Sequence, residues 1–310
     1  PRDSRFFTTA EAMLVEILEH PRRRVGGEAE LLVAPPVRGQ VQLSEALVVE
    51  ETKDDPFAIM ARAAQATTTL TLGTAVSIAF PRSPTVMAMC AWTIQKLSKG
   101  RFTLGLGPQV RGHIQRRFGM QWSPPGPWMR EYVQAVRAVW DCWQNETELN
   151  VQGDHYNINL MVPLFNPGPI DHPDIPILLA AVNKVMCHVA GEVADGIRPH
   201  PVCTPSYIAE VMLPEAQAGA RRAGRALDQF QVAMKPLTAS APTQEELVPK
   251  IRDARARIAF YASTPSYRAA FDHLGLGALA DECKILSRAQ RWEELPDKIS
   301  DESLDQFAVI

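Results

Sequence analysis

Short apolar, β-branched runs alternate with longer amphipathic stretches along most of the chain. This alternation predicts repeated strand–helix–strand units, which build a parallel sheet of the α/β class. About eight runs have the character of strands, and eight is the number that closes a (β/α)8 TIM barrel. The predicted strands are Ala29–Ala34, Ala46–Glu50, Leu70–Ser77, Phe102–Leu106, Ile175–Val182, Gly196–His200, Phe230–Leu237 and Phe307–Ile310.

Two segments interrupt this alternation and predict insertions into a single barrel domain, residues 1–310. The clearest helix, Trp128–Trp143, has apolar residues at helical spacing. Beyond it, residues 146–174 contain two alternating stretches around a Gly-Asp turn, which predicts a β-hairpin and a Pro-rich loop. Residues 244–300 have an almost wholly helical pattern, longer than one barrel crossover needs, and predict a helical insertion.

The two ends of the chain depart from a regular barrel. The first two predicted strands are separated by only about ten residues, fewer than a parallel crossover with a helix requires. We therefore expect residues 1–45 to form an atypical N-terminal region with a shortened first unit. The last predicted strand reaches Ile310, so no closing helix is expected after it.

Composition narrows the range of partners. The 32 Lys and Arg residues nearly balance the 35 Asp and Glu residues, so no chain-wide field attracts nucleic acid or an anionic membrane. No apolar run is long enough to span a membrane, and the five cysteines are scattered, as expected of thiols in a reducing cytoplasm. Four histidines have no partners at metal-ligand spacing, namely His155, His172, His188 and His273. We expect a cytoplasmic protein that binds a small molecule, and no metal, nucleic acid or membrane.

The chain resembles the luciferase-like oxidoreductase superfamily in two neighbouring stretches, LGTAVSIAFPRSPTVMAMCAWTIQKLSKGRFTLGLGPQVRGHIQRRFGMQW and PPGPWMREYVQAVRAVW. Within the superfamily it is most similar to an actinobacterial group of coenzyme F420-dependent oxidoreductases, over roughly residues 46–310. The resemblance implies a (β/α)8 barrel that binds the deazaflavin F420 across the carboxyl ends of its strands, usually as a homodimer.

Carboxylates gather directly after the second predicted strand, where a barrel carries its site residues. Crowded like charges raise the pKa of one member, so Glu51 and Asp54 are candidates for a general acid or base. An equally good interpretation is an ordinary helix start, in which Asp54 and Asp55 cap a helix beginning at Pro56. The resemblance adds that family members often have a histidine, facing the cofactor's reactive ring, where this chain has Asp54.

Small residues follow the third and fourth predicted strands. By resemblance, the Ala75–Val76 bond after Thr74 is a cis peptide that supports the cofactor ring. Glycines such as Gly107 let backbone amides approach an anion, and nearby arginines supply countercharge for a phosphodiester or a substrate acid. Gln109 and His113 match family positions near the cofactor, and His113 is a further candidate proton donor.

Two later strand ends supply the remaining candidates. Ala181, Val182 and Asn183 open a helix whose dipole would favour a phosphate. His200 ends the sixth predicted strand and is either a base that faces a ligand or a structural histidine. These residues complete the predicted cofactor site.

The leading hypothesis is hydride transfer between F420 and a small organic substrate, with Asp54, Glu51 and His113 as candidate proton donors in that order. The alternative is an FMN-dependent monooxygenase on the same scaffold, because both bury a flat tricyclic ring and a phosphate. A third hypothesis is a non-catalytic homologue that binds flavin or another ligand, since a fold does not guarantee a function. The substrate is not predicted, because its pocket would depend on the hairpin near Asp154 and on Tyr261–Tyr267.

Overall fold

The computed structural model describes residues 45–48 and 54–310. The predicted strand Ala29–Ala34, the N-terminal region up to residue 44 and the candidate Glu51 lie outside the described residues. The described chain forms two compact units, residues 45–178 and 179–310. It passes from the first unit to the second within strand β7 (Ile177–Ala181).

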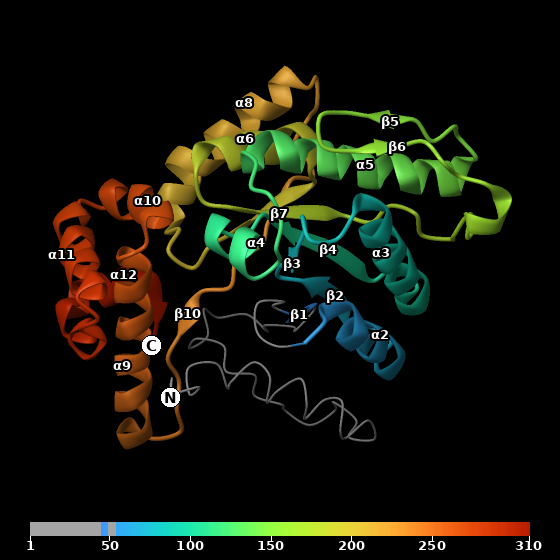
Figure 1. The fold of residues 1–310 in the computed structure, drawn as a ribbon. Helices are drawn as coiled ribbons and strands as arrows, with labels where there is room; N and C mark the ends of the chain where they lie inside the picture. The colour runs from blue at the N-terminus through green and yellow to red at the C-terminus, as the bar shows by residue number, and fades with distance from the viewer. Residues whose placement is uncertain (1–44, 49–53) are drawn as a thin grey trace. The chain divides into compact units, whose positions relative to one another are not determined.

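The first unit contains a parallel sheet with the strand order β1-β2-β4-β7 (Figure 1). Its other strands are β1 (Glu45–Val48), β2 (Thr71–Thr74), β3 (Ser77–Ile78) and β4 (Phe102–Gly107). The predicted strand Leu70–Ser77 is divided in two, because β2 pairs with the start of β4 and β3 pairs with its end. Every residue of β4 is buried, as is usual for an inner strand of a parallel sheet.

Helices follow these strands at positions that local sequence explains. They are α2 (Pro56–Ala66), α3 (Pro84–Ser98), α4 (Arg111–Arg116) and α5 (Pro125–Asn145). Asp55 and Ser83 cap α2 and α3, and each cap is followed by a proline in the first turn. The predicted helix Trp128–Trp143 is confirmed as the middle of α5, and α3 contacts both α2 and α5.

The hairpin predicted within residues 146–174 is confirmed. Strands β5 (Val151–Gln152) and β6 (Asn157–Ile158) are antiparallel, and the 3-10 turn η1 (Pro163–Phe165) follows them. The carboxylate of Glu131, on α5, accepts hydrogen bonds from backbone amides at the hairpin turn, one of them from Tyr156 N at 2.5 Å. This carboxylate therefore holds the hairpin against α5.

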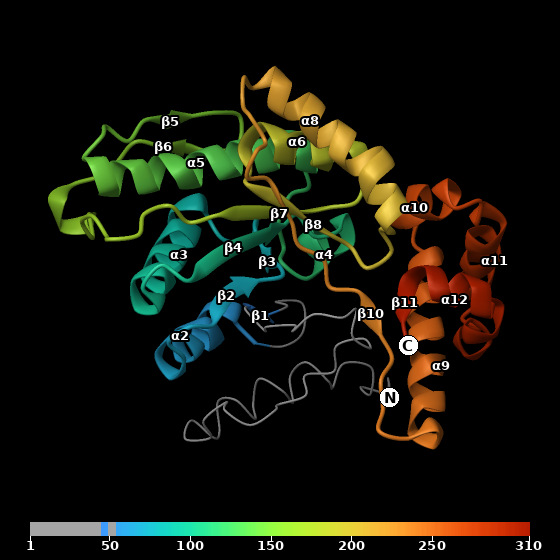
Figure 2. The same cartoon turned by 180° about the vertical axis from the view of Figure 1, so that it is seen from behind.

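The second unit contains strands in the order β7-β8-β9. Two of its helices form a close pair (Figure 2). Strand β8 (Gly196–Pro199) is parallel to β9 (Gln231–Val232). Helix α6 (Lys184–Val193) packs against α8 (Leu213–Arg222). The short α7 (Pro205–Tyr207) and the π-helical turn η2 (Ile208–Met212) lead into α8.

The prediction of one strand over Phe230–Leu237 is wrong. Its residues belong to β9 and to β10 (Leu237–Thr238), which lie in different sheets. Pro236 stands between them and has no backbone N–H to donate to a sheet. Strand β10 pairs instead with β11 (Ala308–Val309), and Phe307, predicted as the start of the last strand, ends a helix.

The helical pattern predicted for residues 244–300 is confirmed. The helices are α9 (Gln244–Ala262), α10 (Arg268–His273), α11 (Gly277–Arg288) and α12 (Asp301–Phe307), with the 3-10 turns η3 (Pro265–Tyr267), η4 (Trp292–Glu294) and η5 (Pro296–Lys298). Helix α9 contacts α11 and α12. Across the described residues, no helix combines the length and apolar character needed to cross a membrane.

Candidate functional site

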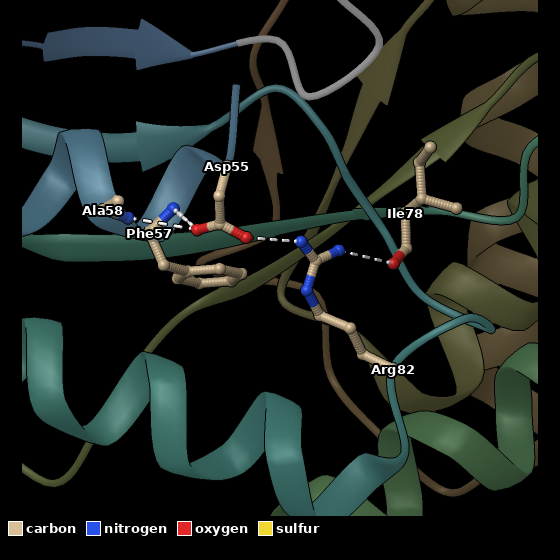
Figure 3. A network of polar contacts seen from close by, with 5 residues as sticks. All are labelled: Asp55, Phe57, Ala58, Ile78 and Arg82. Atoms are coloured by element: carbon tan, nitrogen blue, oxygen red, sulfur yellow. Dashed lines mark hydrogen bonds and ion pairs between the residues drawn. The ribbon is translucent and has the colours of Figure 1, made fainter. Parts of the chain in front are cut away.

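The side chain of Asp55 joins the start of α2 to the loop after β3 (Figure 3). One carboxylate oxygen accepts hydrogen bonds from Phe57 N at 2.9 Å and Ala58 N at 3.1 Å. The other oxygen accepts a hydrogen bond from Arg82 Nη2 at 2.7 Å. Because Arg82 Nη1 also donates to the carbonyl of Ile78 at 3.5 Å, the guanidinium links the helix cap to β3.

These contacts separate the roles of the two neighbouring aspartates. Partial burial raises the pKa of Asp55, but the hydrogen bond from Arg82 and those from the backbone amides lower it by more, so the pKa lies below its usual value. Asp55 is therefore ionised at neutral pH and serves as the helix cap. Asp54 is exposed and makes none of these bonds.

We expect Asp55→Ala to lower the free energy of unfolding at pH 7 by about 1–2 kcal/mol, because a cap and an ion pair are lost. Since the folded-state pKa is depressed, this difference from the wild type is full above pH ~4 and disappears as the pH falls further. Urea denaturation at pH 7 and pH 3 measures it. Asp54→Ala is the matched control, and equal destabilisation by both variants would refute the assignment.

The turn after β2 places the half-buried residues Ala75 and Val76 between two buried polar residues, Thr74 and Ser77. The Ala75–Val76 peptide bond is cis, as the resemblance implies. The hydroxyl of Thr74 donates to the carbonyl of Gly105 at 2.7 Å and accepts from its amide at 2.9 Å, which ties β2 to β4. Ala75 and Val76 are half-buried, whereas the Ser77 hydroxyl is fully buried without a hydrogen-bond partner among the described residues.

The next candidates follow one another between β4 and α4. Gly107 is buried at the end of β4. Gln109 has a φ of 59°, and its side-chain oxygen accepts a hydrogen bond from Val110 N at 2.8 Å. His113 is exposed on α4, and within the described chain no hydrogen bond or ion pair joins it to Asp54.

In the second unit, Ala181, Val182 and Asn183 lie between β7 and α6. Asn183 occupies the N-cap position of α6, but its side chain makes no capping bond and donates instead to the carbonyl of Ser266 at 2.9 Å. The carbonyl of Val182 accepts a hydrogen bond from the hydroxyl of Tyr207 at 3.1 Å. The first turn of α6 thus lacks a side-chain cap, which suits the binding of an anion.

His200 follows β8 and lies between two tyrosines, one at the end of α9 and one in η3. Its ring stacks on Tyr267, with centroids 4.2 Å apart, and meets Tyr261 edge-on at 4.5 Å. Val202 N approaches the Nδ1 atom at 3.4 Å, so the neutral ring carries its proton on Nε2. Burial lowers the pKa of His200 to about 4. This side chain is therefore a neutral hydrogen-bond donor at pH 7 and a weaker base than an ordinary histidine.

We expect nitrogen NMR to show His200 as the Nε2–H tautomer at pH 7, with titration at a pKa of about 4. Between pH ~6.5 and ~4 the unfolded state then binds more protons than the folded state. The stabilisation from neutral His200 is full above pH ~6.5 and is lost as the pH falls, by up to about 3 kcal/mol. His200→Gln should remove this part of the pH dependence. Titration of the wild-type residue near pH 6.5 would show that the ring is not desolvated.

The chain also matches known proteins. A family model described as luciferase-like monooxygenase matches residues 40–310. The chain belongs to this family. An uncharacterised protein of Mycobacterium tuberculosis is 40% identical over 260 residues, which cover 84% of this chain and 76% of the relative. A second M. tuberculosis protein, provisionally named a coenzyme F420-dependent oxidoreductase, is 28% identical over 306 residues, covering 91% of this chain and 83% of the relative.

A solved structure shows the fold of this luciferase-like chain. The coenzyme F420-dependent tetrahydromethanopterin reductase of Methanopyrus kandleri superposes with a TM-score of 0.69 at 18% identity, covering 96% of this chain and 81% of the reductase. The predicted fold class, an α/β chain of the luciferase-like TIM-barrel type, is therefore confirmed.

Several contacts of the candidate residues, in each unit by itself, were not predicted from the sequence. Arg82 pairs with Asp55 from a position 27 residues away, and the tyrosines that contact His200 lie more than 60 residues beyond it. The usable signal for Arg82 is its place just after a strand, where barrels carry site residues. Among the described residues, no three His, Cys, Asp or Glu side chains gather as a metal site would require.

Proposed function

We propose that this luciferase-like protein is an oxidoreductase that transfers a hydride between coenzyme F420 and a small organic substrate. The observation that carries the proposal is the 28% identity, over 91% of the chain, to the relative provisionally named for F420 dependence. When bound, the cofactor would supply the redox chemistry, while the protein binds it, orients it and moves a proton.

In the first unit, the residues after β2 and β4 fit a flat cofactor ring. Ala75 and Val76 have short, half-buried side chains, so a ring can approach the backbone closely. The buried Ser77 hydroxyl, with no partner among the described residues, offers a polar contact of the kind that a ligand or an ordered water satisfies. We propose that Thr74, Ala75 and Val76 support the ring.

In each unit taken by itself, residues that precede a helix are our candidates for contacting the polar part of the cofactor. In the first unit these are Gly107, Gln109 and His113, which lead from β4 into α4. In the second unit they are Ala181, Val182 and Asn183, at the uncapped start of α6, and His200 adds an Nε2–H donor after β8. Backbone amides at a helix start suit a phosphate.

We propose Asp54 as the proton donor, followed by Glu51 and His113. Asp55 does not suit this role, because its carboxylate is already engaged by hydrogen bonds from Arg82 and from two backbone amides. Asp54→Asn is expected to lower kcat about 100-fold while leaving F420 affinity and the melting temperature unchanged. Steady-state kinetics and fluorescence titration of the variant check both parts. An unchanged kcat would move the assignment to Glu51 or His113.

Turnover tests the proposed function. The protein is mixed under anaerobic conditions with reduced F420, deuterated at the transferred position, and with a panel of carbonyl, imine and enone acceptors. We expect protein-dependent oxidation of the cofactor and one deuterium in the product. Oxidation of an organic compound of the panel only in the presence of oxygen and reduced FMN would instead support the alternative, an FMN-dependent monooxygenase. The description of the matching family model favours this alternative.

One further outcome completes the turnover test. Saturable F420 binding without turnover of any acceptor would support a non-catalytic homologue, which the Asp at position 54 motivates.

A homodimer is also part of the proposal. Light scattering of the purified protein tests it, and we expect a mass near twice the 34.3 kDa of the chain.

A further inference from the structure

A small cavity opens in the helical insertion of the second unit, at the end of α9 and beside α11. Its volume is about 170 Å³. Two of its lining residues are cationic, two carry hydroxyl groups and the others are small. The lining residues are Ala262, Ser263, Thr264, Pro265, Arg268, Ala280 and Lys284.

The guanidinium of Arg268 is held in a fixed orientation at this cavity. Its Nε donates to Asp272 at 2.6 Å, and its Nη1 donates to Asp281 at 2.6 Å. A Cβ atom on Gly277 would lie 2.6 Å from the Asp272 carboxylate and 3.1 Å from Arg268 Nη2, so the absence of a side chain there makes room for the pair. The Nη2 group remains as a preoriented donor, because neither carboxylate contacts it within hydrogen-bond distance.

Lys284 supplies a second cation without a countercharge of its own. Its side chain is half-buried, and no carboxylate of the described residues pairs with it. An ammonium group that no protein acceptor contacts can donate its hydrogen bonds to a bound anion. Lys284 and Arg268, whose Nη2 makes no hydrogen bond to either aspartate, both line the cavity and carry donors that suit an oxyanion.

The remaining lining sets the size and polarity of the occupant. The hydroxyls of Ser263 and Thr264 both donate to the carbonyl of Phe260, at 2.7 and 3.1 Å, so their oxygens keep lone pairs that can accept further hydrogen bonds. Ala262 and Ala280 are buried and present only methyl groups. This lining suits a small organic anion that carries its own hydroxyl or amine donor.

Residues next to the cavity lining in the sequence contact predicted site residues. Tyr261 and Tyr267 flank the lining residues 262–265, and both contact the ring of His200. Ser266 accepts the hydrogen bond from Asn183. An occupant of the cavity would thus stabilise the segment that packs on these two candidate residues.

We propose that this cavity binds the carboxylate or phosphate group of a small organic anion, between Arg268 and Lys284. The site is independent of the proposed F420 chemistry, because its lining includes none of the residues assigned to the cofactor. Both anion classes share the chemistry that the two cations recognise, and separate titrations distinguish them.

Methyl NMR of the full chain tests the proposal directly. The protein is labelled with 13C at alanine methyl groups and titrated with lactate or with glycerol phosphate at constant ionic strength in sodium chloride. We expect saturable shifts of the Ala262 and Ala280 methyls with at least one anion, and no shift of Ala91, which lies on α3 in the first unit.

Two lysine variants complete the test. Lys284→Met should weaken binding at least about tenfold, and Lys284→Arg should restore most of it. Lys250→Met removes an exposed lysine from α9 and is the matched control, with affinity expected to stay within about twofold. The absence of saturable shifts with both anions, or equal affinity of Lys284→Met and the wild type, would overturn the proposal.

Discussion

Replacing Gly219 with alanine is expected to lower the free energy of unfolding by at least about 4 kcal/mol, because it forces two packed helices apart. A Cβ atom on Gly219, in α8, would lie 1.9 Å from the carbonyl oxygen of His188, in α6. Gly191 makes the reciprocal contact, since its Cβ would lie 1.8 Å from the carbonyl oxygen of Ala216. Backbone oxygens inside helices cannot rotate away as a flexible side chain can.

The matched control for this variant is Gly112→Ala. Gly112 also lies in a helix, but an added Cβ would meet only the end of the flexible Arg116 side chain, at 3.1 Å. We expect a change of less than about 1 kcal/mol there, since alanine also favours a helix. Urea denaturation measures both variants. A Gly219→Ala protein as stable as Gly112→Ala would show that α6 and α8 do not approach this closely. It would also mean that packing against α8 does not hold the start of α6 in place.

Arg101→Ala is expected to lower the free energy of unfolding by about 3 kcal/mol or more, because it leaves several partly buried carbonyl groups unpaired. The guanidinium of Arg101 donates to the carbonyls of Ala64 at 3.1 Å and Thr67 at 2.9 Å, at the end of α2. It also donates to the carbonyls of Leu70, just before β2, and of Ser98, at the end of α3. One side chain thus joins α2, α3 and β2.

Two controls distinguish this bonding from loss of charge. Arg101→Lys should recover less than half of the lost stability, because an ammonium group cannot present donors in the planar arrangement of a guanidinium. Arg221→Ala, at an exposed position on α8, should cost less than about 0.5 kcal/mol. Full recovery by lysine would mean that charge, and not the geometry of the donors, matters at Arg101.

The strand periodicity of the sequence predicted the inner part of the fold well. Phe102–Leu106 corresponds to β4 and Ile175–Val182 contains β7, because strands buried on both faces leave a continuous apolar run. The same signal failed at Phe230–Leu237, where apolar residues on both sides of Pro236 belong to different sheets. A local pattern reports burial, and it does not report which strand will be the hydrogen-bond partner.

The candidate site was predictable only as far as its residues stand just after strands. That rule placed Ala75, Gly107 and Asn183 at strand ends, where the structure has them. The sequence could not separate Asp54 from Asp55, because the difference depends on Arg82, a contact made through the fold. The protonation of His200 likewise depends on distant tyrosines that remove water from its ring.

A parallel titration of the purified apoprotein with F420 and with FMN tests the central claim most directly. Absorbance and fluorescence of each cofactor report binding without any knowledge of the substrate. We predict saturable binding of F420 with an affinity at least about tenfold higher than that of FMN, which corresponds to 1.4 kcal/mol of binding free energy. Preferential binding of FMN, or saturable binding of neither, would contradict the proposal that this luciferase-like protein is an F420-dependent oxidoreductase.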